Sequence, residues 1–334
     1  MDIGKVEKIR SLEGVKVRKA YDNKNLDRII ADCITENQYM NSCSFPDELL
    51  AECEILFRDG RESTSCSESN DFRNRICYII RDIEGKIVGI QGRSTIDTDW
   101  KRNCYVMNDP LWKNAYWDSK WDKGIKKKHK KLIQKVINTA GFDKSNYLYL
   151  LHKYVNKTGD IDKIVIVEGL KDALRVYQQK LGGVAVVSIM GAEISSKQTE
   201  LLQTVFGLDK QIILSLDGDD AGYQGSLNVY EVLKTRGFNN ISFVLYPKIN
   251  QYGFYYKDFG DITSPEMITA TLQSTVDLDT YKAEMKDRVW YARAVKSIKE
   301  KEERAEYWET IKNDFIPCRK EDMPTQVREL FGIK

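Results

Sequence analysis

Acidic residues gather directly after an apolar run near the middle of the C-terminal half. Residues 215–222 read SLDGDDAG and place Asp217, Asp219 and Asp220 within four positions. Like charges this close together are unfavourable unless a cation or solvent screens them. The same letters are also typical of a polar loop between a strand and a helix, so the neighbouring segments must decide between the two interpretations.

Further acids follow two other apolar runs. Glu168 ends VIVEG, Asp172 comes four residues later, and KDFGD contains Asp258 and Asp261. An acid in the first turn of a helix is favoured by the helix dipole, so Asp172 alone says little. Carboxylates that converge from several strand ends, however, are the ligands that hard divalent cations prefer. The predicted metal ligands are Glu168, Asp172, Asp217, Asp219, Asp258 and Asp261.

A regular alternation of elements between residues 161 and 247 must position these acids. The runs IDKIVIV, GVAVVSIM, QIILSL and ISFVLYP are short and rich in β-branched residues, as in buried strands. Stretches of helical pattern separate them, at 172–180, 195–206 and 224–235. This alternation predicts an α/β fold with a mostly parallel sheet flanked by helices. Sites in such sheets lie beyond the carboxyl ends of the strands, which is where the acids fall.

The rest of the chain predicts two other kinds of structure. Residues 39–100 mix short strands, RICYIIRD and KIVGIQGRS around the turn IEGK, with loops such as 63–70 (STSCSESN). After Pro265 the pattern is that of amphipathic helices with charged faces. We therefore expect an N-terminal helical segment at 1–38, a mixed α+β subdomain at 39–160, the parallel α/β domain at 161–265 and a helical C-terminal region at 266–334.

Composition argues against several classes of protein. The 334 residues have a net charge of +2, with 42% hydrophobic and 31% charged residues, which is typical of a globular domain in water. We see no apolar run long enough to span a membrane and no signal peptide, and expect a cytoplasmic protein without a membrane partner. Seven scattered cysteines, never spaced CxxC, and two histidines argue against disulfides and against a zinc site.

One segment is strongly basic. Residues 101–135 hold eleven Lys and Arg against three Asp, and tryptophans and tyrosines alternate with lysines from Trp100 to Trp121. Aromatic faces can stack on bases while lysines contact phosphates, and in that case Arg102 and Lys127 would bind nucleic acid. The alternative is an amphipathic segment with its aromatic residues in a core and its charges in solvent. The sequence leaves both interpretations open.

The acidic motifs resemble a known domain. In order and spacing, VEGLKDAL, MGAEISSKQTELL, LDGDDAG and KDFGD are similar to the Toprim domain, which bacterial DnaG-type primases, type IA and II topoisomerases and some nucleases share. Residues 71–94 (DFRNRICYIIRDIEGKIVGIQGRS) resemble the signature of the RNA-polymerase domain of bacterial and phage primases, with Ile90 in place of an aromatic residue. Residues 142–151 (FDKSNYLYLL) resemble the lysine-containing segment before the first Toprim strand. Topoisomerases and Toprim nucleases lack this N-terminal block, so the resemblance favours a primase core.

The resemblance implies an activity and a set of residues. The activity is template-directed synthesis of short RNA primers on single-stranded DNA from ribonucleoside triphosphates, with two Mg²⁺ or Mn²⁺ ions and a replicative helicase as a further partner. Glu168, Asp217 and Asp219 would be catalytic, with Asp172 assisting. The residues implied to contact template or nucleotide are Arg73, Arg75, Arg93 and Lys144.

The sequence departs from the family in one respect and leaves two other functions open. Primases usually carry an N-terminal zinc-binding module, and its cysteine pattern is absent here, so we expect no zinc and slow initiation without a partner. This compact form would suit a phage or mobile-element protein. A metal-dependent Toprim nuclease could use the same acids to activate water. A non-catalytic nucleic-acid-binding homologue could keep them for folding alone.

Overall fold

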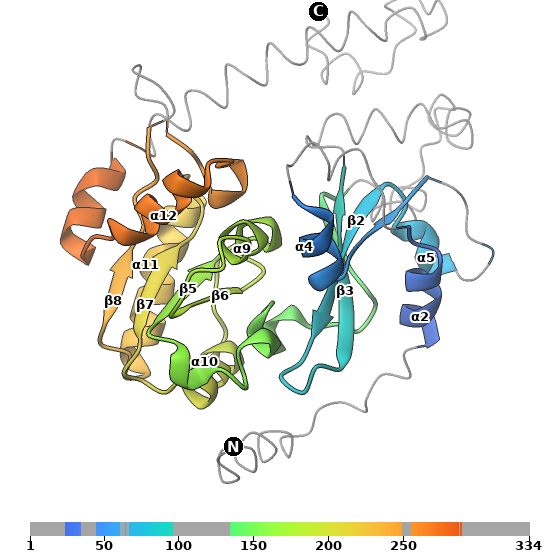
Figure 1. Ribbon diagram of the computed structural model, residues 1–334, viewed down its shortest axis with the longest axis horizontal. Coiled ribbons are helices and arrows are strands. Elements are labelled where there is room, and N and C mark those ends of the chain that lie inside the picture. Colours follow the sequence, from blue (N-terminus) through green and yellow to red (C-terminus); the bar gives the residue numbers. More distant parts are fainter. Residues whose placement is uncertain are drawn as a thin grey trace, which may run out of the picture.

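The computed structural model describes residues 24–34, 45–60, 64, 67–95, 134–248, 255–286 and 288. Two four-stranded sheets lie side by side in it, each with helices packed around it (Figure 1). Residues 101–133, most of the strongly basic segment, fall outside the described residues, as do 1–23 and 289–334. No helix in the described part of the chain is both long and apolar enough to cross a membrane.

The C-terminal sheet is parallel throughout, in the order β6-β5-β7-β8. Its strands are β5 (Lys163–Val167), β6 (Val184–Ser188), β7 (Gln211–Ser215) and β8 (Ile241–Phe243). Val167 pairs in register with both Ser188 and Ser215, so β6, β5 and β7 end level with one another. The predicted parallel α/β fold is therefore confirmed. The fourth strand, β8, is shorter than predicted. Beyond Phe243 the chain makes one further main-chain hydrogen bond to β7, from Val244 N to Leu214 O, and then leaves the sheet.

Helices connect these strands and cover the sheet (Figure 1). They are α9 (Leu170–Tyr177), α10 (Ser196–Phe206) and α11 (Asp220–Thr235). The Ser195 hydroxyl caps α10 by accepting a hydrogen bond from the Gln198 amide. Helix α11 begins four residues before the predicted start, because the Asp219 carboxylate accepts from the Gly222 amide and so makes the acidic segment its N-cap.

The N-terminal sheet is antiparallel, in chain order. It contains β1 (Ile55–Arg58), β2 (Arg75–Arg81), β3 (Ile87–Ser94) and β4 (Val136–Asn138), with helices α2 (Lys24–Ala31), α4 (Asp47–Glu52) and α5 (Ser67–Asp71). Helix α5 corrects the prediction of a loop at 63–70. It is held by polar contacts that no hydrophobic pattern reveals, since the buried Ser69 hydroxyl donates to Asp32 and accepts from Arg58.

Strand β2 connects the cores of the two halves. Its side chains alternate, so Ile76, Tyr78 and Ile80 join the large core that also contains the parallel sheet, while Cys77 and Ile79 pack with α2. Residues 144–160 link the two sheets through three short 3-10 turns, η2 (Lys144–Asn146), η3 (Leu151–Lys153) and η4 (Thr158–Asp160). The antiparallel sheet thus turns one face toward the parallel sheet.

The chain after β8 returns to the carboxyl edge of the parallel sheet. A 3-10 turn, η5 (Phe259–Asp261), is followed by α12 (Pro265–Gln273), and residues 278–286 are helical. Val276 pairs with Phe243 beside β8. Phe259 is fully buried and packs edge-on against Tyr246. This packing fixes η5, and the acids on it, against the strand ends.

Candidate metal centre

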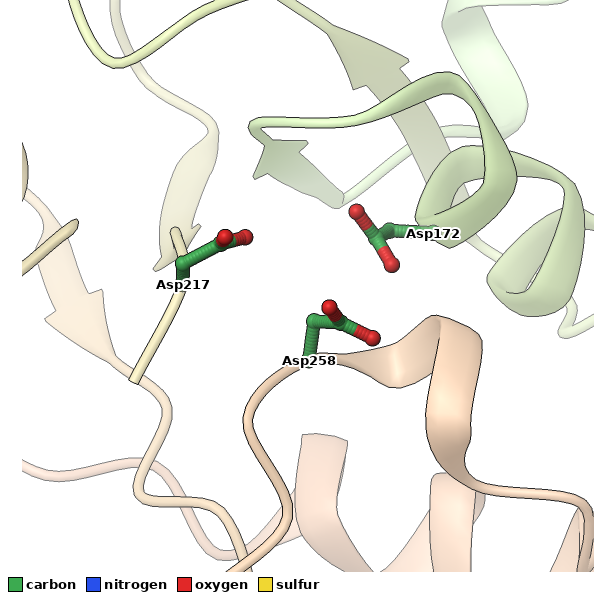
Figure 2. Close-up of side chains that lie close together, drawn as sticks. All are labelled: Asp172, Asp217 and Asp258. Carbon is green, nitrogen blue, oxygen red and sulfur yellow. The ribbon is translucent and has the colours of Figure 1, made fainter. Parts of the chain in front are cut away.

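Three carboxylates meet at the carboxyl edge of the parallel sheet. One oxygen from each of Asp172, Asp217 and Asp258 lies within 4.8 Å of the others. Figure 2 shows the three side chains pointing toward a common space from the first turn of α9, the loop after β7 and the start of η5. The sequence predicted this convergence, because parallel strands bring their carboxyl ends to one edge.

Main-chain amides hold two of these acids in place. Asp172 is only 6% exposed, and its two oxygens accept from the amides of Gly260 at 2.8 Å and Gly169 at 3.1 Å. Asp258 caps η5 by accepting from the Asp261 amide at 3.1 Å. Asp172 therefore ties the start of α9 to the turn that carries Asp258, and the two carboxylates are positioned together.

Glu168 directly follows β5, beside the group, and has an unsatisfied oxygen. Its Oε2 is buried and has no hydrogen-bond partner among the described residues. Burial, and then repulsion from Asp217, raises the pKa of Glu168 from its ordinary value of 4.5 to about 7. Burial likewise raises the pKa of Asp217 and that of Asp258, the latter well above its ordinary value, with Asp172 adding to the effect at Asp258. An orphaned carboxylate oxygen among buried acids fits a bound divalent cation, which would favour the charged forms of all of them.

The cluster also contains a lysine that is not among the predicted site residues. Lys257 Nζ lies 2.7 Å from Asp217 Oδ2 and 3.0 Å from Asp219 Oδ2. Burial opposes its charge, but Asp217 and Asp219 raise the pKa of Lys257 above its ordinary value. Lys257 directly precedes Asp258 in KDFGD, but the sequence does not reveal the direction in which its side chain points.

The three-acid group leaves out three predicted ligands. Asp219 lies next to it but uses Oδ1 to cap α11, at 3.1 Å from the Gly222 amide. Glu168 is coupled to Asp217 through charge and is not one of the three grouped acids. Asp261 is 57% exposed and lies 3.9 Å from Lys171, so its position gives no support for a ligand role.

The predicted nucleic-acid-binding residues divide by burial. Arg75 is 1% exposed and donates to the main-chain carbonyls of Gly92, Gln134 and Lys135. It is therefore a structural residue of the antiparallel sheet, and the prediction that it contacts template or nucleotide does not fit its burial. The Arg75 guanidinium donates hydrogen bonds to these carbonyls where β3 and β4 meet.

The other predicted basic residues remain accessible or undescribed. Arg93 pairs with Ile76 across β2 and β3, so its half-buried side chain lies on the face turned toward the parallel sheet. Arg73 is half-buried just before β2. Lys144 is exposed, and its Nζ donates to Met190 O at 2.6 Å, in the loop after β6. Arg102 and Lys127 lie outside the described residues.

Comparison with known proteins identifies the domain that carries the acids. Residues 165–253 match a family model described as Toprim-like. They form a Toprim-like domain. The matched residues include Glu168, Asp172 and Asp217 and end five residues before Asp258. Asp258 is therefore assigned to the site from its position in the structure alone.

Relatives that match half of the chain or more are named DNA primase. The DNA primase of Staphylococcus epidermidis is 26% identical over 203 residues, which are 61% of this chain and 27% of that protein. The DNA primase of Clostridium acetobutylicum is 26% identical over 168 residues, 50% of this chain and 22% of that protein. The chain thus matches about a quarter of the length of these relatives.

A solved structure shares the fold. The crystal structure of the Aquifex aeolicus primase, with its zinc-binding and RNA polymerase domains, superposes with a TM-score of 0.51 at 18% identity, covering 79% of this chain and 64% of that one. At this identity the likeness concerns the fold. Together with the Toprim-like match and the primase relatives, it confirms the resemblance to the catalytic core of DnaG-type primases.

The raised pKa of Glu168 predicts how stability depends on pH in the absence of metal. Between about pH 4.5 and 7 the folded protein holds this proton while the unfolded chain releases it. The free energy of unfolding should therefore fall as pH rises through this window, by roughly 1 kcal/mol or more. Urea unfolding in EDTA at pH 5.5 and 7.5 measures the difference. The free energy of unfolding of the Glu168→Gln variant should change less between these two pH values. An equal change in the variant and in the wild type would contradict the raised pKa of Glu168.

Proposed function

We propose that this chain is the catalytic core of a DNA primase, which joins ribonucleotides into short RNA primers on single-stranded DNA. The observation that carries the proposal is the meeting of Asp172, Asp217 and Asp258 within 4.8 Å at the edge of a Toprim-like domain. The antiparallel sheet beside it supports primase over the other Toprim enzymes, because residues 71–94 form β2 and β3 there. Relatives named DNA primase agree with this choice.

The acids would hold two divalent ions, Mg²⁺ or Mn²⁺. Such ions, when bound, lower the pKa of a primer 3′-hydroxyl and stabilise the oxygen of the leaving pyrophosphate. Asp217, Asp258 and Glu168 offer the ligand oxygens, and Glu168 Oε2 has none of the competing hydrogen bonds that occupy Asp172. Asp172 positions the turn with Asp258, and Asp219 remains a proposed ligand through the oxygen that now contacts Lys257.

Basic side chains would hold the template and the incoming nucleotide. Arg93 lies on the sheet face turned toward the metal centre's domain, and a guanidinium binds phosphate through two parallel hydrogen bonds. Lys144, anchored beside the loop after β6, and Arg73 are proposed to contact the same strand or the triphosphate. The proposed partners are single-stranded DNA and ribonucleoside triphosphates, with a replicative helicase as in the resemblance. The proposed site of action is the cytoplasm.

One experiment separates primase from its alternatives. Labelled ribonucleotides are supplied with single-stranded DNA, with and without an annealed RNA primer, in Mg²⁺ or Mn²⁺, and cleavage of the same DNA is followed in parallel. Incorporation without cleavage supports the proposal, and the primed template keeps slow initiation from being mistaken for inactivity. Cleavage without incorporation would make the protein a Toprim nuclease. Binding with neither reaction would make it a non-catalytic homologue.

The basic segment gives a further prediction, although its residues lie outside those the structure describes. Changing lysines 126–128, 130 and 131 to glutamine should weaken binding of all single-stranded DNA sequences alike and flatten the salt dependence, since each phosphate contact releases counterions. Fluorescence anisotropy titrations between about 50 and 200 mM salt measure how steeply the binding constant falls with salt concentration. Changing Lys296, Lys299 and Lys301 is the control. An unchanged salt dependence would indicate that residues 101–135 form a solvated surface and do not bind nucleic acid.

A further inference from the structure

Lys257 places a positive charge inside the acidic cluster. Its ammonium contacts Asp217 at 2.7 Å and Asp219 at 3.0 Å, and both of these oxygens belong to proposed metal ligands. A cation that already neutralises two carboxylates competes with any other cation that needs them. The lysine therefore bears directly on how the site takes up metal.

The geometry allows the ammonium to leave while the main chain stays in place. The Lys257 carbonyl accepts from the Gly218 amide at 2.6 Å, which fixes the lysine's backbone against the loop after β7. Its side chain is 44% exposed, whereas that of Asp217 is 18% exposed. A flexible four-carbon stem on a fixed anchor can swing its charged end into solvent. Asp217 has no comparable freedom.

A divalent ion and the ammonium cannot both bind Asp217 Oδ2. Mg²⁺ and Mn²⁺ bind carboxylate oxygens at about 2.1 Å, and Asp217 Oδ2 is the atom that Lys257 holds. Cations sharing one carboxylate would repel each other strongly at such distances. Because the lysine side chain is 44% exposed, water can hydrate its ammonium once the contact with Asp217 is broken.

We infer that Lys257 is a resident counter-ion of the metal centre, which holds Asp217 and Asp219 in the metal-free protein and is displaced by a divalent ion. The inference rests on the metal site of the proposed function and adds a residue to it. The lysine keeps the clustered carboxylates from repelling one another before metal arrives. It also lowers the apparent affinity for metal, because the ion must replace it.

The test measures Mn²⁺ binding by electron paramagnetic resonance, with no nucleotide or DNA present. The Lys257→Met and Lys257→Gln variants should bind Mn²⁺ about fivefold more tightly than the wild type, since no ammonium has to leave. In EDTA, both should melt at a lower temperature, and Mn²⁺ should raise their melting temperature by more than it raises that of the wild type. Lys257→Arg, which keeps the charge, should bind Mn²⁺ more weakly than either.

Lys171→Met is the matched control. This lysine lies in the same region but contacts Asp261 at 3.9 Å, so its loss should leave Mn²⁺ affinity nearly unchanged. Equal or weaker Mn²⁺ binding by both neutral Lys257 variants, folded by circular dichroism, would overturn the inference. So would an equal gain in Lys171→Met, which would indicate a general charge effect. Competitive Mn²⁺ binding without primer synthesis would contradict the proposed function and leave the counter-ion role standing.

Discussion

Asp217→Asn should lower ribonucleotide incorporation by more than about a hundredfold while the protein remains folded, because the variant loses the charge of a proposed metal ligand. The amide has nearly the shape of the carboxylate, and Asp217 lies among the three grouped acids. Burial raises the pKa of Asp217, which means that its charge opposes folding. Removing that charge should therefore not destabilise the metal-free domain greatly. Primed-template extension at saturating Mg²⁺ measures the activity, and urea unfolding measures the stability.

Asp220→Asn is the control within the same acidic segment. Asp220 lies in the first turn of α11 and is outside the group of three acids. Its variant should keep incorporation within a few-fold of the wild type. Both variants should bind single-stranded DNA with near-normal affinity, because the proposed contacts to DNA come from basic residues. Wild-type turnover by Asp217→Asn would show that the acidic cluster is not the catalytic centre.

Gly222→Ala should disrupt the site through the main chain. A Cβ at this position would lie 2.0 Å from the carbonyl oxygen of Asp217 and 2.8 Å from its Cα. These atoms belong to the backbone, so the loop after β7 or the start of α11 must shift. We expect a loss of about 2–3 kcal/mol in the free energy of unfolding, typical of overpacking, together with weaker Mn²⁺ binding. Urea unfolding and Mn²⁺ titration measure the two effects.

Gly182→Ala provides the comparison for this change. Among the described residues, no heavy atom lies within 4 Å of a Cβ built there, and the glycine does not have a positive φ. Its substitution should therefore alter the free energy of unfolding by less than about 0.5 kcal/mol. If Gly222→Ala matched Gly182→Ala in stability and in Mn²⁺ affinity, the close approach of α11 to Asp217 would be irrelevant to the site.

The sequence could predict the parallel sheet and the convergence of its acids for one physical reason. Continuous β-branched runs between helical stretches indicate buried parallel strands, and parallel strands share a carboxyl edge. Asp217 directly follows β7 and Asp172 lies in the first turn of the helix after β5, so the shared strand edge brings these two acids together, whereas Asp258 joins them from the 3-10 turn η5. The start of α11 was missed because the acids that suggested a loop also form its N-cap.

Side-chain direction accounts for what could not be predicted. In KDFGD the 3-10 turn η5 directs Asp258 into the cluster and leaves Asp261 57% exposed, although both are aspartates three residues apart. Arg75 was grouped with Arg73 and Arg93 by its motif, yet it is buried against carbonyls from β3 and the residues before β4. Those partners lie far along the chain, and only the tertiary structure brings them together.

The hydrogen bond from the Gly260 amide to Asp172 also bears on the order of folding. It joins segments separated by 88 positions, and the third grouped acid, Asp217, comes from between them. A chain folded only as far as β7 has two of the three carboxylates and lacks the turn that completes the set. Divalent metal stabilises a state more, the more tightly that state binds it, so partly folded forms that lack the complete set gain little from it. Metal bound at the proposed site would thus act selectively on the finished domain and draw late intermediates toward it, so that its binding would report complete assembly of the domain.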